Sequence, residues 1–455
     1  MKERSMQFVC TQCGRIETKW LGRCPDCGSW NSFEEELAAP SPQKSGKTAQ
    51  MSTETKPVSL SEISVEPGFR YETGIFELDR VLGGGVMKGS SILLGGEPGI
   101  GKSTLMLQMI EKCSFNRSVL YVSGEESPSQ VKLRAQRLEL SLSNISIFCD
   151  TRIEVLVSVL QKTKPEVVVV DSLQTLSSSE VASPAGSVNQ IRFCSTELVG
   201  VCKQMGISLF LIGHVTKEGV LAGPKVIEHL VDTVLYFDQA GSGVRLIRSA
   251  KNRFGSVDEI GIFHMSEKGL IAVENPSSFF ITEREGEKTP PGIAYTAVVE
   301  GTRTFLVEIQ ALTVPSKNGF SRVYSDRIDT ARVTRIAAIL ERHAQIHLND
   351  QDIYVNVAGG MKLSEVSIEL PLALALWSAL QGVSLPSGLV SFGELSLAGE
   401  VRTIGFAEKR EKAASELGFS RILLPKTHHS TGKLKQYPCE TIRKALEICG
   451  TMKVK

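Results

Sequence analysis

Hydrophobic residues gather in short continuous runs through the middle of the chain. Runs of this length and composition are typical of strands that are buried on both faces. Between them lie segments with helical periodicity, such as 105–113 and 154–163. The strand-like runs are 91–96, 118–124, 165–172, 207–213, 231–237 and 244–252. Strands that alternate with helices predict an α/β unit built on a mostly parallel sheet.

The pattern changes on both sides of this unit. Beyond residue 280 the strands are shorter and alternate in polarity, as in 293–313, and they are followed by helices such as 326–343. This predicts a separate α+β domain. Near the N-terminus, a Cys/Gly/Trp-rich segment is followed by one rich in Ala, Ser, Thr, Pro and Lys, which is typical of a flexible linker. We therefore predict four parts: a small Cys-rich module at 1–36, a linker at 37–58, an α/β domain at 59–275 and an α+β domain at 280–455.

Composition and charge narrow the choice of function. The chain has 42% hydrophobic and 22% charged residues, which is close to globular averages. A formal net charge of +1 excludes a bulk polybasic tail, so any nucleic-acid contact must come from local patches. No apolar run approaches the ~18 residues of a membrane span, and the N-terminus lacks the apolar segment of a secretory signal. We expect a cytoplasmic protein with no membrane partner.

Four of the ten cysteines fall within eighteen positions near the N-terminus. Cys10, Cys13, Cys24 and Cys27 follow the spacing C-x2-C-x10-C-x2-C, and a glycine comes directly after each pair. Two such turns present four thiolates tetrahedrally, which suits a structural Zn2+ with no open position. The alternative of four ordinary thiols or a redox pair is less consistent with two glycine-framed pairs. The segment 1–36 is therefore predicted to be a zinc module whose folding depends on its metal.

A phosphate-binding loop is predicted after the first buried run. The sequence matches G-x-x-x-x-G-K-[ST] and lies between a strand and a helix, which is the context that this motif requires. Its residues are Gly96, Glu97, Pro98, Gly99, Ile100, Gly101, Lys102 and Ser103, with Thr104 next in the helix. Lys102 is expected to neutralise charge on the β- and γ-phosphates of ATP, and Ser103 to ligate Mg2+.

Polar residues at the ends of three other strands complete the predicted nucleotide site. Asp171 ends a buried valine run and is expected to hold Mg2+. Glu125, with Glu126 as the alternative, follows another strand and is expected to activate the attacking water. His214 could sense the γ-phosphate, although a purely structural histidine is almost as consistent with the sequence.

These motifs, together with LDRVLGGGVMKGS at 78–90 and KNRFG at 251–255, resemble those of the RadA family of bacterial DNA repair proteins, also called Sms. The resemblance extends over essentially the whole chain. It implies a RecA-like core, a DNA-stimulated ATPase that promotes branch migration of recombination intermediates, and a role under stress. It also implies a homohexameric ring similar to replicative DnaB helicases, single-stranded and branched DNA as partners, and a recombinase partner.

KNRFG places two cations, Lys251 and Arg253, just beyond a strand. In ring ATPases a cation from a neighbouring subunit can stabilise charge during phosphoryl transfer. We therefore expect Lys251 and Arg253 to act on ATP in trans, or to couple the nucleotide state to DNA. A basic turn that is simply exposed to solvent is the alternative.

Two Gly/Ser-rich loops, 177–189 and 215–224, are long enough to be mobile. In RecA-like proteins the corresponding loops face the central DNA. Neither loop contains an aromatic residue, so stacking on bases is not expected. Arg192, Lys217 and Lys225 could contact phosphates instead, which would give binding independent of DNA sequence.

The C-terminal domain looks like the protease domain of Lon, which uses a Ser–Lys dyad. Ser367 stands at the nucleophile position within changed flanks. Glu408 matches the place of the lysine, and Lys409 is one position away. The domain is therefore expected to be non-proteolytic and to serve ring assembly and DNA contact. A run of arginines could contribute to that contact or form an ordinary solvated face: Arg322, Arg327, Arg332, Arg335 and Arg342.

Two rival functions remain open from the sequence. One is an ATP-dependent Lon-like protease, and the other is an ATP-driven signalling ring that resembles KaiC and does not act on DNA. The changed flanks of Ser367 argue against the first. The zinc module and KNRFG argue against the second.

Overall fold

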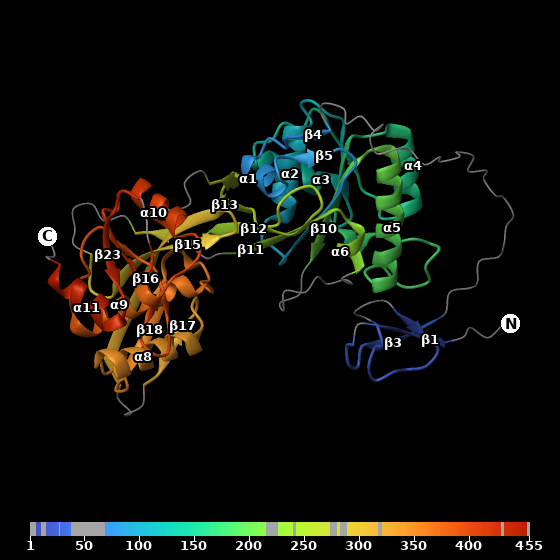
Figure 1. Ribbon diagram of the computed structural model, residues 1–455. Coiled ribbons are helices and arrows are strands. Elements are labelled where there is room, and N and C mark those ends of the chain that lie inside the picture. The colour runs from blue at the N-terminus through green and yellow to red at the C-terminus, as the bar shows by residue number, and fades with distance from the viewer. Residues whose placement is uncertain are drawn as a thin grey trace, which may run out of the picture. The chain divides into compact units, whose positions relative to one another are not determined.

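The computed structural model describes residues 6–10, 15–26, 28–37, 69–214, 226–239, 243–273, 280–282, 289–316, 321–428 and 432–452. The chain divides into two compact units (Figure 1). The first comprises Met1–Asp238 with Leu246–Ala272, and the second comprises Gln239–Arg245 with Val273–Lys455. Within the ranges given above, no helix has the length and apolar character needed to cross a membrane.

The N-terminal module is a small antiparallel sheet with the strand order β2-β1-β3. Its strands are β1 (Met6–Cys10), β2 (Ile16–Glu17) and β3 (Phe33–Leu37). Cys10, Cys24 and Phe33 form its buried cluster. So few apolar residues supply little burial energy, which is why a small module of this kind depends on a bound metal for its stability.

A nine-stranded sheet forms the centre of the first unit, in the order β14-β13-β12-β11-β6-β10-β9-β7-β8. The six strands from β11 to β8 pair in parallel, and β13 and β14 pair antiparallel. The strands are β6 (Ser91–Gly96), β7 (Val119–Ser123), β8 (Ile145–Phe148), β9 (Val167–Asp171), β10 (Ser208–His214), β11 (Thr233–Gln239), β12 (Val244–Asn252), β13 (Ile260–Ser266) and β14 (Gly269–Ala272). A two-stranded sheet is formed by β4 (Arg70–Tyr71) and β5 (Val86–Met87).

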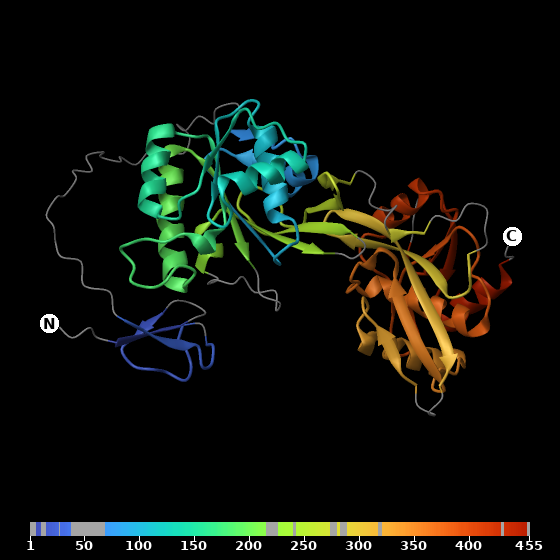
Figure 2. The same cartoon turned by 180° about the vertical axis from the view of Figure 1, so that it is seen from behind.

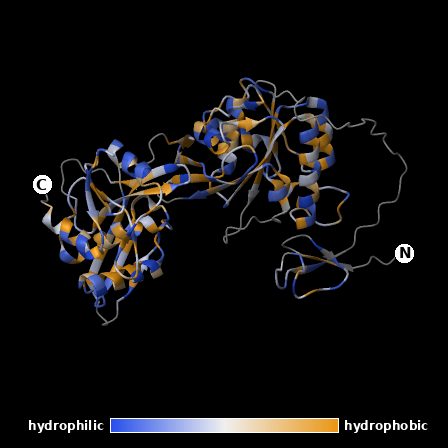
Figure 3. Cartoon of the chain, viewed as in Figure 1, coloured by the Kyte–Doolittle hydropathy of each residue, from blue (hydrophilic) through white to orange (hydrophobic). Residues whose placement is uncertain are grey.

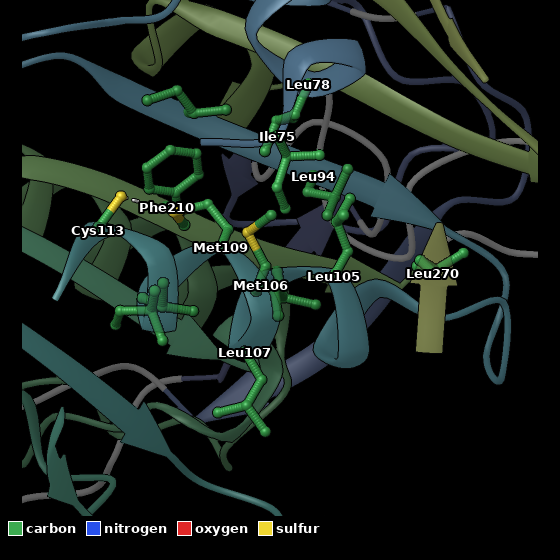
Figure 4. Packing of buried hydrophobic residues seen from close by; sticks show 14 of the residues in the cluster. Ile75, Leu78, Leu94, Leu105, Met106, Leu107, Met109, Cys113, Phe210 and Leu270 are labelled. Atoms are coloured by element: carbon green, nitrogen blue, oxygen red, sulfur yellow. Dashed lines mark hydrogen bonds between the residues drawn. The ribbon is translucent and has the colours of Figure 1, made fainter. Parts of the chain in front are cut away.

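Helices cover both faces of this sheet, as the continuous apolar runs require. Alternate residues of each strand enter different cores: Leu94 packs with Met106 and Phe210 on one face (Figure 4), and Leu93 packs with Leu156 and other residues on the opposite face. The helices of the first face are α1 (Phe76–Val81), α2 (Lys102–Cys113) and α3 (Pro128–Arg137). Those of the second are α4 (Ile153–Thr163), α5 (Val188–Met205) and α6 (Val226–Leu230). In Figure 2, α4 and α5 lie side by side, and in Figure 3 both carry hydrophilic as well as hydrophobic residues.

The second unit is built on a seven-stranded mixed sheet in the order β17-β18-β16-β15-β19-β22-β23. Its strands are β15 (Ile293–Glu300), β16 (Arg303–Pro315), β17 (Val323–Ser325), β18 (Gln351–Val357), β19 (Leu389–Ser391), β22 (Arg421–Pro425) and β23 (Lys435–Cys439). A short hairpin is formed by β20 (Glu394–Leu395) and β21 (Val401–Arg402). The helices are α8 (Thr330–Ala344), α9 (Glu369–Gln381), α10 (Ala407–Glu416) and α11 (Ile442–Thr451). Strands and helices are mixed rather than regularly alternating, as predicted.

Candidate functional site

The phosphate-loop sequence joins the end of β6 to the first residue of α2. Gly101 has φ +116°, a left-handed conformation that glycine adopts without strain. A Cβ at this position would lie 2.8 Å from Met265 Cε, so the neighbouring hairpin also excludes a side chain. The loop therefore turns tightly into the positive end of a twelve-residue helix, which is an arrangement suited to phosphate.

Lys102 lies inside this loop and is only 4% exposed. Its Nζ donates hydrogen bonds to the carbonyl oxygens of Gly96, at 2.6 Å, and Glu97, at 2.8 Å. Burial lowers the pKa of Lys102 to about 8, although the charges of Asp171 and Glu125 act in the opposite direction. No ion pair to Lys102 is present in the described part of the chain. Its ammonium group is therefore held by main-chain carbonyls that a phosphate group could replace.

Two carboxylates lie at the ends of neighbouring strands beside this lysine. Ser123 and Asp171 are register partners in β7 and β9, so Glu125 and Asp171 come to the same edge of the sheet. The Tyr121 hydroxyl donates to Asp171 Oδ2 at 2.6 Å, and the Ser172 hydroxyl donates to Glu125 Oε1 at 2.5 Å. Burial, together with the charge of Asp171, raises the pKa of Tyr121 well above its usual value, so its hydroxyl keeps its proton.

The turn after β7 separates the two glutamates that the sequence left as alternatives. Glu126 forms an ion pair with Arg134 of α3, whereas Glu125 faces Ser172. Gly124 allows this turn to pass close to the short 3-10 helix Leu173–Thr175 that follows β9, because a Cβ there would lie 1.8 Å from Thr175 Oγ1. The geometry therefore favours Glu125 over Glu126 as the group that faces the phosphate loop.

The other predicted nucleotide-site residues are placed to different extents. Ser103 and Thr104 lie in the first turn of α2. The backbone of His214 is the register partner of Gly96, which puts this residue beside the start of the phosphate loop. The His214 side chain lies outside the described part of the structure, so its proposed contact with phosphate stays a prediction.

A cavity that sequence reasoning missed opens beside the first turn of α2. Its volume is about 570 Å3, and it is lined by Thr104, Arg137, Leu138, Glu139, Met265, Ser266, Glu267, Lys268 and Gly269. Gln108 of α2 exchanges two hydrogen bonds with the backbone of Leu270, at 3.0 and 3.2 Å, which fixes the β13–β14 hairpin as one wall. No local signal in the sequence indicates this wall, because it depends on the packing of segments about 160 residues apart.

Lys251 and Arg253, the two cations of KNRFG, lie near one end of the parallel strands, and the phosphate loop lies at the other end. The Arg253 amide donates to the Asp232 carbonyl, next to the first residue of β11, and that residue pairs with Ile92 near the start of β6. The phosphate loop follows the other end of β6. The two ends of β6 are five residue steps apart, which is roughly 17 Å. Lys251 and Arg253 are therefore too far away to contact a nucleotide at the phosphate loop of the same chain.

Lys251 and Arg253 differ in how firmly they are held. Lys251 Nζ donates to the carbonyl oxygens of Glu228 (2.8 Å), His229 (3.3 Å) and Val231 (2.7 Å), around the end of α6. Desolvation and the nearby Arg253 lower the pKa of Lys251. The Arg253 side chain is 55% exposed and lies 3.7 Å from Asp232. Arg253 is thus the more available cation of the two.

Arg70 connects KNRFG to the glycine-rich segment that precedes the phosphate loop. Its guanidinium donates to the carbonyl oxygens of Leu82 (3.0 Å), Gly83 and Gly85 (3.2 Å), and to that of Phe254 (2.6 Å). Two of the motifs that carry the family resemblance are therefore parts of one structural cluster.

The first predicted DNA loop is held more firmly than its composition suggests. The buried side chain of Gln190 bonds to the backbone of Ser178, Val181 and Ser183, at 2.8–3.0 Å, and Glu154 accepts three hydrogen bonds from Ser178 and Ser179. Arg192 is exposed on the following helix. The second loop, 215–224, with its Lys217, and the next residue, Lys225, lie outside the described residues.

The two described cysteines of the N-terminal module have matching backbone environments. The Cys10 amide donates to the Arg15 carbonyl and the Cys24 amide to the Ser29 carbonyl, each five residues ahead and at 2.9 Å. Both side chains are buried. Repeated turns of this kind suit a ribbon that holds one metal between two cysteine pairs. Cys13 and Cys27, the other two predicted ligands, lie outside the described part of the chain.

In the second unit, the residue that faces Ser367 is Arg410. Ser367 is 1% exposed, and Arg410 Nη1 donates to its hydroxyl at 3.1 Å. The same guanidinium makes two bonds of 2.8 Å to Glu365 and also bonds to the carbonyls of Ala297 and Gly405. Glu408 and Lys409 are exposed on α10. The assignment of the lysine position to Glu408 was therefore wrong, because the helix turns Arg410 towards the serine.

The arginine run predicted near α8 does not form a single basic surface. Arg335 forms an ion pair with the buried Glu369, and Arg332 Nε lies 3.6 Å from the same carboxylate. Arg332 also donates to the carbonyls of Ser364 and Glu365. For these two residues, an internal structural role is therefore the better interpretation.

Fold and site together define a RecA-like P-loop ATPase that carries an N-terminal zinc ribbon and a C-terminal Lon-protease-like domain. Family models agree with each part: KaiC matches residues 71–147, the rubredoxin metal binding domain matches 8–35, and subunit ChlI of Mg-chelatase matches 325–428.

Full-length relatives then identify the family. The chain is 47% identical to the DNA repair protein RadA of Treponema pallidum, over 93% of this chain and 92% of the relative. It is 43% identical to that of Listeria monocytogenes, over 98% of both, and 44% identical to that of Bacillus subtilis, over 93% of both. The chain belongs to the RadA family of DNA repair ATPases, as its motifs predicted.

Proposed function

We propose that this protein is a DNA-dependent ATPase that works as a homohexameric ring on single-stranded and branched DNA and promotes branch migration during recombination. The observation that carries this proposal is the place of Arg253, exposed at the sheet edge opposite its own phosphate loop. A ring lets such a cation serve a neighbour's nucleotide. A recombinase is the expected partner, since branch migration extends the products of strand exchange.

In the proposed mechanism Lys102 exchanges its two carbonyl partners for oxygens of the β- and γ-phosphates. Ser103 and Asp171 are the residues that would hold Mg2+, which would neutralise phosphate charge when bound. Glu125, held by Ser172, accepts a proton from the attacking water. His214, beside Gly96 in the sheet, is the candidate sensor of the γ-phosphate.

We assign the cavity beside Thr104 to the nucleoside of ATP. It begins at the residue after Ser103 and therefore continues from the phosphate loop along the first turn of α2. Arg137 and Met265 offer a planar cation and an apolar side chain, and both can pack against a base. Among the described residues Arg137 makes no ion pair, so its guanidinium is available for this contact.

The remaining parts have separate proposed roles. Residues 1–36 hold structural Zn2+ through Cys10, Cys13, Cys24 and Cys27, and 37–58 tether this module to the ATPase domain, 59–275. If so, replacing Cys24 and Cys27 by Ser releases zinc and unfolds the module alone. Metal analysis of the intact protein checks this assignment, and a protein without bound zinc would contradict it.

We propose that the Lon-like domain, 280–455, is not a protease and instead supports ring assembly and DNA contact. A Ser–Lys dyad needs a lysine that can lose its proton, whereas a guanidinium stays charged at all relevant pH values. Arg410 moreover forms a bidentate ion pair with Glu365. Ser367 therefore has no base to activate it among the described residues around it.

Steady-state ATP hydrolysis with and without single-stranded DNA tests the main proposal. We expect DNA to stimulate hydrolysis at low salt and to lose this effect as salt rises, because phosphate contacts release counterions. Hydrolysis that ignores DNA would favour the KaiC-like signalling ring. Cleavage of casein that disappears in Ser367→Ala would favour the protease.

Mixing subunits tests the trans role of Arg253. Arg253→Ala is expected to keep nucleotide binding and to inhibit wild-type subunits when the two are mixed, because each mutant subunit disables a neighbour. Lys162→Ala serves as the control, since this exposed cation of α4 has no proposed contact with nucleotide or DNA. Activity that simply follows the wild-type fraction would leave DNA coupling as the role of the motif.

A further inference from the structure

A buried hydroxyl contacts the proposed magnesium ligand from the neighbouring strand. Tyr121 is 1% exposed, and its hydroxyl donates to Asp171 Oδ2 at 2.6 Å. Its ring packs in the core on the α2 side of the sheet, among Leu107 and Val131. Across the described residues, no other group donates a hydrogen bond to this carboxylate.

The register of the sheet explains why tyrosine can make this contact. Tyr121 pairs with Val169 and Ser123 pairs with Asp171, so Tyr121 and Asp171 are diagonal neighbours on one face. A diagonal neighbour is within reach of a long aromatic side chain but not of a short hydroxyl. A second hydrogen bond joins the same two strand ends in the opposite direction. Ser172, which follows β9, donates to Glu125, which follows β7, at 2.5 Å.

We propose that Tyr121 is a positioning residue for the magnesium–nucleotide site. Its hydroxyl occupies one oxygen of the Asp171 carboxylate and restricts rotation of that group, which leaves the second oxygen for the Mg2+ shell. Outer contacts of this kind orient metal ligands and affect metal affinity. The inference rests on the proposed role of Asp171.

The competing explanation is that Tyr121 serves only the core. A buried tyrosine hydroxyl needs a hydrogen-bond partner, and Asp171 could merely satisfy that need. In that case removal of the hydroxyl would leave the carboxylate, and the response to Mg2+, unchanged. Tyr121→Phe separates the two explanations because phenylalanine fills the same space in the core.

The test is a Mg2+ titration of the full-length protein, followed through binding of a fluorescent ATP analogue under conditions without turnover. Tyr121→Phe is expected to raise the Mg2+ concentration at half-saturation by about tenfold or more. Analogue binding without Mg2+ should stay within about twofold of wild type, because Lys102 and the loop amides are intact. The thermal unfolding midpoint of each variant confirms that it is folded.

Tyr236→Phe is the matched control. It removes another tyrosine–carboxylate hydrogen bond in the same sheet, from Tyr236 to Glu228 at 2.9 Å, and should leave the Mg2+ titration unchanged. Asp171→Asn tests the underlying assignment. A titration altered by Asp171→Asn but not by Tyr121→Phe would overturn the positioning role alone. A titration that Asp171→Asn does not alter would overturn the proposed magnesium ligand, and the inference with it.

Discussion

Lys102 in the ATPase domain and Arg410 in the Lon-like domain are both long cations withdrawn from solvent, 4% and 3% exposed. Within the described residues, Lys102 is held by two main-chain carbonyls, and burial lowers its pKa to about 8. Arg410 is paired with the carboxylate of Glu365 and has further partners on three segments. A buried cation without a carboxylate partner is prepared to accept an anionic ligand, whereas one with its partner in place holds the fold together.

The largest expected effect that tests this contrast is on catalysis. Lys102→Met should reduce ATP hydrolysis by a factor of about 1000 or more, since a lost charge contact in a transition state costs several kcal/mol. The folded state should be as stable as wild type or more stable, because a desolvated ammonium is replaced by an apolar chain. Steady-state hydrolysis and thermal unfolding without nucleotide measure the two effects. Activity within tenfold of wild type would contradict the site assignment.

Arg410→Met should have the opposite effect on stability. Removing the arginine leaves Glu365 without its charged partner and the Ala297 carbonyl without the guanidinium donor, which is expected to cost about 3 kcal/mol. Hydrogen exchange should speed up in β15 and α10, while ATP hydrolysis by the first unit persists. A variant as stable as Lys102→Met would show that the two cations do not differ in the way proposed.

The pH dependence of nucleotide binding sharpens the contrast further. The charged form of Lys102 is the one that binds phosphate, so affinity for ATP should fall about fivefold between pH 8 and pH 9. Between pH 8 and 10.5 the unfolded chain binds more protons at this lysine than the folded chain, so the nucleotide-free protein should gain stability as pH rises. Isothermal titration calorimetry checks the affinity. Lys102→Met should show neither trend.

Ser367→Ala is expected to have the smallest effect. It removes one of several hydrogen bonds to Arg410, at a cost of about 1 kcal/mol, and should not change ATP hydrolysis. Denaturant unfolding of the second unit measures the stability change. A large loss of a DNA-dependent activity would instead assign this serine a functional role.

The sequence signals that predict the nucleotide site are local. A glycine-rich loop between strand and helix places Lys102 and Ser103, and the ends of parallel strands bring Asp171 and Glu125 to one edge. Tyr121 escapes such reasoning because it lies within a buried run and its ring is indistinguishable from ordinary core. Its contact with Asp171 depends on β9 being the neighbour of β7, and the sequence of one strand does not reveal which strand pairs with it.

The Lon-like domain shows where motif matching fails. The match of Glu408 to the lysine position was two residues away from the side chain that faces Ser367. Two positions on a helix rotate a side chain by about 200°, so a small error in alignment exchanges the exposed and buried faces. The cavity lined by Arg137 and Met265 was missed for a different reason, since it forms only when the β13–β14 hairpin packs on α2.

The bonds of Arg70 have a mechanical consequence. One rigid, planar guanidinium joins the glycine turn at 82–85 to the carbonyl of Phe254, next to Arg253 in the chain. A displacement of Arg253 would therefore also pull on the glycine turn through Arg70. Arg70 is the first residue of β4, which pairs with β5, so the same displacement would be passed on to this two-stranded sheet. Arg70 in this way couples the position of the KNRFG segment to that of β4 and β5.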